Sequence, residues 1–391
     1  MIFFEKAYEI VLANVKLAKC ENVNFTLSLG RVLAMDVFAD MDMPPFNKSA
    51  VDGYACRSSD IKSELRVIEV VPAGKMPVNR ISEGNCTKIM TGAVIPDGAD
   101  CVLMVENTEK TGEDTIRYIY EDSPLNICFT GEDIKKNALV LQKGTLIKPQ
   151  HVAVLASMGC VFPLVSARPK IGIIATGEEI VEPDTQPAVS QIRNSNAYQL
   201  ISQSERAGGI PVYEGIVPDK EEYILKILTK SLSENDIIIL TGGVSMGDFD
   251  IVPAMLKKAG VDIKFQTIAI QPGKPTLFGT YGDKLVFGLP GNPVSSFLQF
   301  ELLVRPAICK MTGMSCLPAN LQMPLATAYH RRRTERLSLV PVKINNKCEA
   351  VPVEYHGSAH INSLNDADGV MFVPIGVPAI EKGTMVNVRQ I

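Results

Sequence analysis

The residues best suited to chemistry follow a continuous apolar run, Asp236–Leu240. The segment Thr241–Asp250 (TGGVSMGDFD) places two glycines after that run and two aspartates, Asp248 and Asp250, a few residues later. Glycines let backbone N–H groups approach an anion, and a following helix adds its positive N-terminus. The segment matches neither the Walker A pattern nor GxGxxG, so it is not a common nucleotide motif. It can be an ordinary strand-to-helix turn, but the aspartates favour a phosphate site assisted by Mg²⁺.

Three further segments carry groups that bind anions or cations. Thr176–Glu179 (TGEE) ends a short apolar run, Pro272–Pro275 (PGKP) holds Lys274 on a stiff turn, and Leu289–Ser296 (LPGNPVSS) opens a helix. Parallel strands bring their carboxyl ends to one edge of a sheet, so these segments are expected on one rim. Carboxylates beside an anion-binding loop repel the anion unless a divalent cation lies between them. The combination favours a metal-assisted site, although two glutamates at a helix start are often a solvated cap.

The N-terminal half contains three segments rich in turn residues and polar side chains. They are Pro44–Tyr54 (PPFNKSAVDGY), Met90–Ala93 (MTGA) and Gly131–Ile134 (GEDI). By composition alone, each is equally typical of a plain turn. His356 and His360 lie four apart, but the glycine between them and the surrounding β pattern make a helical metal pair a poor interpretation.

The arrangement of apolar runs and turns predicts a multidomain protein of the α/β plus β class. Strands and helices alternate over residues 169–317, which indicates a doubly wound α/β domain whose ligands bind beyond the strand ends. Residues 46–136 are typical of a mostly β domain, and residues 318–391 of a small β-barrel. The segments 1–45 and 137–168 each contain a short helical pattern and are expected to form a discontinuous helical linker domain.

Helix and strand limits within the α/β stretch follow from capping residues. A helix is expected to begin at Asn194 or Ser195 and to end at Gly208. A strand over 211–217, a helix over 219–233 and a last helix over 294–311 follow, the last one broken near Pro306 because proline cannot continue a helical ladder.

Composition excludes several functional classes. The 391 residues include 39 Lys and Arg against 43 Asp and Glu, so no basic field exists for nucleic acid or an anionic membrane. No apolar stretch is long enough for a membrane span. The nine cysteines are scattered and show no CxxC, which argues against zinc fingers, iron–sulfur sites and a disulfide framework. A cytoplasmic location is therefore expected.

Seven motifs in one order carry a resemblance that covers nearly the whole chain. They are PPFNKSAVDGYA, MTGAVIPDGADCVLMVE, GEDI, ATGEEI, TGGVSMGDFD, PGKPTLFG and GLPGNPVSSF. The chain resembles the molybdopterin molybdenumtransferase family, whose relatives include the C-terminal domain of gephyrin. The resemblance implies four subdomains, among them a molybdopterin-binding α/β domain. It also implies a homodimer with active sites shared between subunits.

The resemblance implies a reaction in which molybdate and adenylylated molybdopterin give molybdenum cofactor and AMP with Mg²⁺. It further implies an upstream molybdopterin adenylyltransferase and downstream molybdoenzymes as partners. Molybdate is a tetrahedral dianion that lysine, hydroxyl and N–H groups can bind as they bind phosphate. The dithiolene sulfurs of the substrate hold the molybdenum, so no protein cysteine is needed.

Family positions can be carried over one residue at a time. Asp219 and Asp250 are expected to hold Mg²⁺, with Glu179 supporting the metal or positioning water. Lys274 would bind the oxyanion. The residues expected to cradle pyrophosphate or pterin are Gly242, Gly243, Ser245, Gly291, Asn292 and Ser296. The residues expected to face them from the second subunit are Asp52, Thr91, Asp133 and Ser358.

The chain also departs from its relatives. Some relatives have lysine where this chain has Gln266 and Gln271, and an Asp-Ser-Asn of relatives is here Asn194–Asn196. A C-terminal Arg-Gly of some relatives is missing, and Arg331, Arg332, Arg333 and Arg336 are the candidates to replace it. A tungsten-inserting paralogue and a non-catalytic pterin-binding scaffold remain alternatives, and a nucleotide hydrolase of the same α/β superfamily fits the N-terminal motifs poorly.

Overall fold

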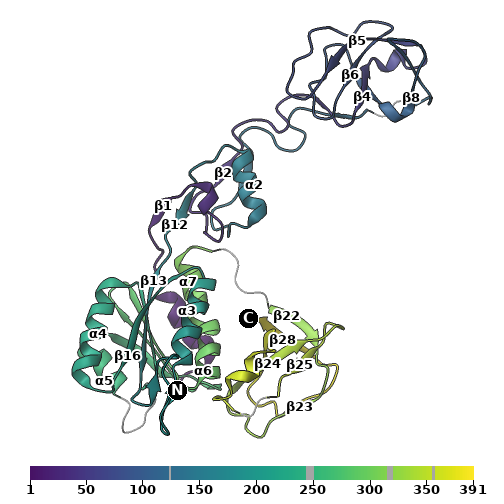
Figure 1. The fold of residues 1–391 in the computed structure, drawn as a ribbon. Coiled ribbons are helices and arrows are strands. Elements are labelled where there is room, and N and C mark those ends of the chain that lie inside the picture. Colours follow the sequence, from purple (N-terminus) through teal and green to yellow (C-terminus); the bar gives the residue numbers. More distant parts are fainter. Residues whose placement is uncertain (123–124, 244–250, 315–319, 355–356) are drawn as a thin grey trace. The chain divides into compact units, whose positions relative to one another are not determined.

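The computed structural model of the chain describes residues 1–122, 125–243, 251–314, 320–354 and 357–391. Its contacts divide the chain into two compact units (Figure 1). The first comprises Met1–Met35, Lys143–Val152 and Phe162–Ile391, and the second comprises Asp36–Gln142 and Ala153–Val161. Every helix within the described ranges is too short or too polar to span a lipid bilayer.

A six-stranded mixed sheet forms the centre of the first unit, in the order β16–β13–β17–β21–β20–β18. The parallel strands are β16 (Ile210–Val217), β13 (Lys170–Thr176), β17 (Ile237–Thr241) and β21 (Lys284–Leu289). β20 (Pro275–Tyr281) runs opposite to the other strands because a tight turn at Gly282 joins it directly to β21, and it pairs antiparallel with β21 and with the edge strand β18 (Asp262–Thr267). The expected α/β domain is confirmed, with an antiparallel edge added to its parallel strands.

Helices cover both faces of this sheet (Figure 1). α4 (Glu221–Glu234) and α5 (Val252–Lys258) pack on one face, where their apolar side chains form one core with the sheet. The helices on the other face are α1 (Phe4–Ala13), α3 (Ser195–Arg206), α6 (Pro293–Gln299) and α7 (Arg305–Met311). This doubly wound arrangement brings the loops after the parallel strands to one edge of the sheet.

The helix limits follow the capping signals closely. The Asn194 side chain accepts a hydrogen bond from Ala197 N (3.2 Å), and α3 ends just before Gly208, which has a φ of +93°. The last helical segment is interrupted, as expected, but by a π-helical turn over Phe300–Val304 that lies between α6 and α7. Pro306 follows that turn and lacks the N–H that a continuous α-helical ladder requires.

The C-terminal residues form the expected β domain within the first unit. Its strands are β22 (Asn320–Pro324), β24 (Leu337–Ile344), β25 (Ala350–Pro352), β26 (Gly369–Val373) and β28 (Met385–Gln390). A parallel bridge between Leu325 and Ala350 brings the two ends of this sheet together. β19 (Ile270–Gln271), which precedes the PGKP turn, pairs in parallel with β24. β23 (Tyr329–His330) and β27 (Ala379–Ile380) form a separate ribbon.

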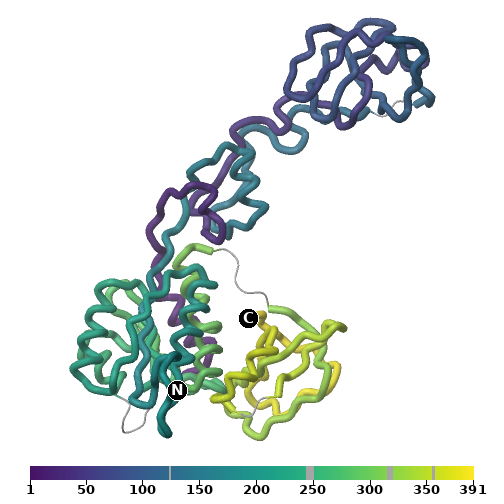
Figure 2. Tube along the Cα trace, viewed as in Figure 1, coloured from purple at the N-terminus to yellow at the C-terminus, as the bar shows by residue number. Residues whose placement is uncertain are grey.

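The second unit is built on a sheet in the order β7–β4–β6–β5–β9–β8. Its strands are β4 (Gly53–Cys56), β5 (Leu65–Val71), β6 (Asn85–Ile89), β7 (Cys101–Met104), β8 (Thr108–Lys110) and β9 (Thr115–Tyr118). Two further ribbons pair early and late segments of this unit, β2 (Val37–Phe38) with β11 (Leu139–Leu141) and β3 (Lys48–Ser49) with β10 (Ile127–Cys128). Figure 2 shows these purple and teal segments side by side.

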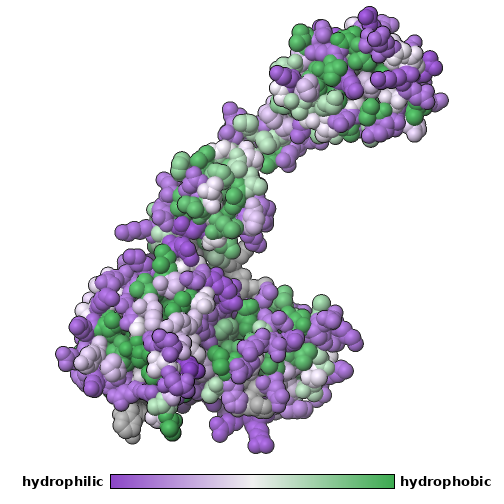
Figure 3. Space-filling model, in the orientation of Figure 1, coloured by the Kyte–Doolittle hydropathy of each residue, from purple (hydrophilic) through white to green (hydrophobic). Residues whose placement is uncertain are grey.

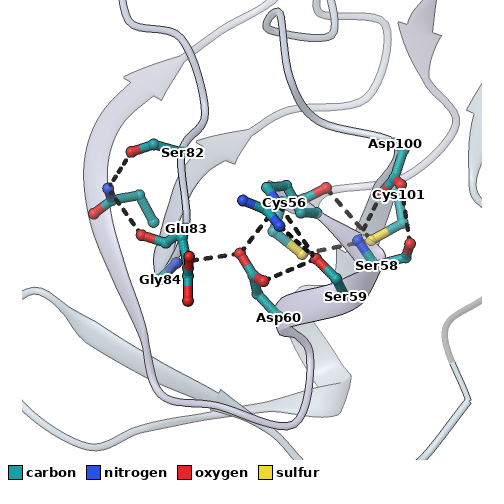
Figure 4. A network of polar contacts seen from close by, with 11 residues as sticks. Cys56, Ser58, Ser59, Asp60, Ser82, Glu83, Gly84, Asp100 and Cys101 are labelled. Atoms are coloured by element: carbon teal, nitrogen blue, oxygen red, sulfur yellow. Dashed lines mark hydrogen bonds and ion pairs between the residues drawn. The ribbon is translucent and has the colours of Figure 1, made fainter.

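Two buried cysteines face each other on β4 and β7, the two strands at one edge of this sheet. Cys56 lies opposite Cys101 across β4 and β7, with the two Sγ atoms 3.5 Å apart (Figure 4). Beside them the Asp100 carboxylate accepts hydrogen bonds from Ser58 N (2.6 Å) and Ser58 Oγ (2.9 Å). Hydrogen bonding to Cys101 and burial raise the pKa of the Cys56 thiol far above its usual range, so this thiol stays protonated.

A short strand pair and a short helix lie outside the three six-stranded sheets. β1 (Cys20–Asn22) pairs with β12 (Leu164–Ser166) in the first unit. α2 (Pro149–Ser157) accounts for the helical pattern expected within 137–168 and begins at a proline whose missing N–H needs no helical partner.

Candidate active site

A cavity of about 620 Å³ opens at the edge of the central sheet where β13 and β17 end. It is built by the ends of these strands, by the start of α3, by the loop before α6, and by a short segment of the β domain. The described residues that line it are Thr176, Glu179, Ile180, Ile192, Arg193, Asn194, Ser195, Asn196, Thr241, Gly242, Gly243, Pro275, Pro290, Gly291, Asn292, Pro293, Ala359 and Ile361. Three of the four segments singled out in the α/β sequence therefore meet here, and the PGKP turn contributes Pro275.

Gly242, the first residue after β17, is required by close backbone packing. A Cβ on Gly242 would lie 2.2 Å from the carbonyl oxygen of Thr176, and its φ of +94° also disfavours other residues. A Cβ on Gly291 would lie 3.7 Å from the Cα of Gly242, so the two glycine loops are adjacent. Their backbones line the cavity without side chains in front of them, which suits a ligand that binds N–H groups.

Asn196 joins the two glycine loops. Its amide Nδ2 donates to Thr241 Oγ1 (2.9 Å) and to the carbonyl oxygen of Gly291 (2.8 Å). Thr241 Oγ1 in turn donates to the Pro290 carbonyl (3.3 Å). The Asn196 side chain thus fixes the start of α3 against both loops, a role that the sequence did not reveal.

The carboxylates expected to hold Mg²⁺ lie beside these loops. Glu179 lines the cavity, and its backbone carbonyl accepts a hydrogen bond from Ile192 N (2.8 Å) between β14 (Ile180–Val181) and β15 (Ile192–Arg193). A Cβ on Gly243 would lie 3.7 Å from Asp219 Oδ1, so Asp219 flanks the same loop. Hard carboxylate oxygens are the donors that Mg²⁺ prefers.

Two residues predicted for the site, the metal ligand Asp250 and the loop residue Ser245, lie outside the residues that the structure describes. Within the described ranges, no group of three or more His, Cys, Asp or Glu is placed to hold a metal. The donor chemistry of Asp219 and Glu179 fits Mg²⁺, and a complete set of protein ligands would need Asp250.

Lys274 sits beside the cavity lining and is exposed to solvent. Its turn is held by Gln299, whose Nε2 donates to the Pro272 carbonyl (3.4 Å), and by Thr276, whose Oγ1 donates to the Gly273 carbonyl (2.8 Å). A Cβ on Gly273 would lie 2.4 Å from Gln299 Nε2, so this turn needs glycine. Its neighbour Pro275, rather than the lysine, is in the lining.

The structure places two predicted serines differently from the sequence-based interpretation. Ser296 is fully buried and is not in the cavity lining, because its position on α6 faces the core. Ser358 was expected to face the cavity from a second subunit. It instead accepts a hydrogen bond from Asn292 Nδ2 at its Oγ (2.7 Å) and another from Val294 N at its carbonyl (3.1 Å). Ser358 therefore supports the cavity loop of its own chain.

The remaining predicted residues belong to the second unit, where the three N-terminal motifs meet. Asp52 Oδ1 accepts hydrogen bonds from Thr91 N (2.6 Å) and Thr91 Oγ1 (2.7 Å). These bonds, first the backbone one and then the hydroxyl one, lower the pKa of Asp52. Asp133 is exposed, and its N–H donates to the Met43 carbonyl (3.0 Å). Asn47 Oδ1 accepts from Thr130 N (2.9 Å), so the PPFN segment also contacts the turn before GEDI.

Comparison with known proteins identifies the family. Three family models match successive parts of the chain: MoeA N-terminal region (domain I and II) at residues 2–159, probable molybdopterin binding domain at 172–310, and MoeA C-terminal region (domain IV) at 319–391. The molybdopterin molybdenumtransferase of Staphylococcus epidermidis is 34% identical over 379 residues, which cover 94% of this chain and 90% of that protein. The chain belongs to the molybdopterin molybdenumtransferase family.

Further relatives agree with this membership. The molybdopterin molybdenumtransferase of Bacillus subtilis is 35% identical over 378 residues, covering 92% of this chain and 87% of that protein. The crystal structure of the molybdopterin biosynthesis moeA protein from Pyrococcus horikoshii matches with a TM-score of 0.86 and 32% identity, covering all of both chains. The resemblance drawn from the motifs is confirmed, and with it an enzyme of the transferase class in molybdenum cofactor biosynthesis.

Proposed function

We propose that this molybdopterin molybdenumtransferase family chain inserts molybdenum from molybdate into the dithiolene of adenylylated molybdopterin and releases AMP. The observation that supports this most is the pair of adjacent glycine loops, tied together by Asn196, at the open edge of an α/β sheet. Backbone N–H groups and a helix start on one cavity suit a ligand with a phosphoanhydride. The relatives' shared name supplies the substrate class.

The proposed metal is Mg²⁺, held by Asp219 and Asp250 with Glu179 in support. When bound, it would neutralise the negative charge that develops on the phosphoanhydride as AMP leaves. The chain's own groups do the rest: Gly242, Gly243 and Gly291 let backbone approach the phosphates, and Lys274 stands beside the cavity as a cation. Molybdenum itself is cargo and arrives as molybdate.

The second unit is proposed to complete the site of a partner subunit in a homodimer. Asp52 and Thr91 form a hydrogen-bonded pair, and Asp133 is exposed on the neighbouring motif. Exposed apolar side chains in this unit suit an interface between copies, and Figure 3 shows green hydrophobic surface over the part that holds β2. They include Phe38, Met41 and Leu139.

The proposed setting is a cytoplasmic pathway. An adenylyltransferase would supply the adenylylated pterin, and molybdoenzymes would accept the product. The domain limits proposed are 1–45 with 137–168, 46–136, 169–317 and 318–391.

The decisive assay measures AMP release from adenylylated molybdopterin with Mg²⁺, with molybdate or tungstate added in parallel and metal-bound pterin quantified. Oxyanion-dependent AMP release with metal transferred to the pterin is expected, and the lower half-saturating oxyanion names the metal. Tight pterin binding without turnover would favour a scaffold. AMP release that needs neither pterin nor oxyanion would favour a nucleotide hydrolase.

Hybrid dimers test the shared site. Asp250→Asn should abolish Mg²⁺-dependent turnover, and Asp52→Ala should abolish it from the opposite side of the site. Mixing the two variants should restore part of the activity, since one of the two sites in a hybrid carries both native residues. Well-mixed hybrids without any recovery would argue against a site built by two subunits.

A further inference from the structure

The cavity contains a cation that the sequence motifs did not point to. Among its described lining residues, the only charged side chains are Glu179 and Arg193. Arg193 ends β15, whose pairing with β14 places it opposite Val181. Its guanidinium is exposed and makes one long contact, from Nη2 to Gln186 Oε1 at 3.4 Å. No ion pair joins Arg193 to a carboxylate in the described part of the chain, so its donors remain available to a ligand.

The groups around Arg193 also favour an anion. Arg193 directly precedes Asn194, the N-cap of the 12-residue helix α3. Ser195 begins that helix, is exposed, and belongs to the cavity lining, so the first turn of α3 lies at the cavity. The positive end of the helix adds to the guanidinium charge.

A buried hydroxyl in the same cavity provides an independent indication of a ligand. Thr176 lines the cavity, is 1% exposed, and its Oγ1 has no hydrogen-bond partner among the described residues. Polar atoms buried this deeply are normally hydrogen-bonded, so an unpartnered one calls for an explanation. A ligand oxygen at the glycine loop would supply the missing partner.

The lysine expected to bind the oxyanion, Lys274, is absent from the described lining of the cavity. Gln266 and Gln271, which stand where some relatives have lysine, are neutral and are absent from that lining as well. Arginine presents a planar fork of donors that matches tetrahedral oxyanions through two parallel bonds, which a neutral side chain cannot do.

We propose that Arg193, with Ser195 at the start of α3, binds a tetrahedral dianion in this cavity, either an inorganic oxyanion or a phosphoryl group of the substrate. This assignment rests on the proposed function for its biological meaning, but the binding itself does not require turnover. It makes Arg193, rather than Lys274, the principal cation of the described cavity.

Equilibrium titration of the full-length protein tests the assignment without the pterin substrate. Molybdate, tungstate and AMP are titrated separately into the native protein, Arg193→Gln, Arg193→Lys and the control Arg117→Gln, an exposed arginine on β9 of the second unit that is not part of the cavity lining. Arg193→Gln should weaken binding of at least one ligand by about 10- to 100-fold, the usual worth of a charged hydrogen-bonded contact. Arg193→Lys should recover part of the loss, and Arg117→Gln should match the native protein.

Each result has a definite meaning. A loss confined to molybdate and tungstate places the inorganic oxyanion on Arg193, and a loss confined to AMP places the phosphoryl group there. Native-like binding of all three ligands by Arg193→Gln would overturn the assignment, as would a native protein that binds none of them. Failure of AMP release in the turnover assay, with oxyanion binding intact and dependent on Arg193, would count against the proposed reaction alone.

Discussion

Asn196 offers the sharpest test of how the cavity is assembled, because one amide holds both glycine loops. In Asn196→Ala, the buried Thr241 hydroxyl and the Gly291 carbonyl each lose their donor. The buried Thr241 hydroxyl left without its donor costs about 1–3 kcal/mol of unfolding free energy, while the exposed Gly291 can bond to water, and most domains survive a loss of this size. A loop displaced by about 1 Å can lower kcat/KM about 100-fold, and that is the expected loss of activity.

Asn235 provides the matched control at the opposite end of β17. Its amide is also buried and donates to Ser231 Oγ (3.0 Å), Ser231 O (3.2 Å) and Glu214 Oε1 (3.3 Å). Asn235→Ala should lose a similar free energy of unfolding in urea titrations, with AMP release per folded molecule near the native value. The reasoning is refuted if Asn196→Ala keeps native kcat/KM, or if both variants lose activity equally at equal folded fraction.

Two further substitutions have worked-out outcomes. Gly242→Ala should lower both activity and stability more than Gly208→Ala does. Both positions have positive φ, but only at Gly242 would the new Cβ lie against the Thr176 backbone. Thermal unfolding and AMP release compare the two variants. Thr91→Val should raise the lowered pKa of Asp52 part of the way back, because the hydroxyl bond goes while the backbone bond stays; carboxyl-carbon NMR titration measures this. The stabilisation from this contact should be present above the ordinary aspartate pKa and should be lost as pH falls through the lower pKa of Asp52 in the folded protein. An unchanged Asp52 pKa in Thr91→Val would contradict the assignment of the lowered pKa to the Thr91 hydroxyl.

Local signals in the sequence were sufficient for much of the fold. The Asn194 cap, Gly208 at the end of α3 and the apolar run of β17 each act within a few residues, so their structures could be predicted. The break before Pro306 was predicted for the same reason, although its π-helical form was not. The alternation of helices and strands predicted the layers of helix and sheet in the α/β domain. The reversal of β20 was not predicted, because it depends on one tight turn at Gly282 that the pattern did not indicate.

The site was harder to predict because its contacts connect residues far apart in the sequence. The glycine loops were recognised from composition, but the role of Asn196 depends on contacts to residues 241 and 291. Ser358 reaches Asn292 across 66 positions of the chain, and no local pattern indicates that pairing. Arg193 lines the cavity only because β15 pairs with β14, two strands of two residues each that no periodicity reveals.

The packing of the N-terminal helix has a consequence for folding during synthesis. Ile2 exchanges hydrogen bonds with Thr267 and Ala269, and the Leu12 carbonyl accepts one from Lys310 Nζ (2.8 Å). Ribosomes add about 5–20 residues per second, so α1 waits on the order of 10–60 s for its partners to emerge. Its apolar face is exposed throughout that interval, while the second unit, complete by residue 161, can already fold. α1 is thus made long before its partners and is buried only after them, which makes it a candidate for chaperone binding on the nascent chain.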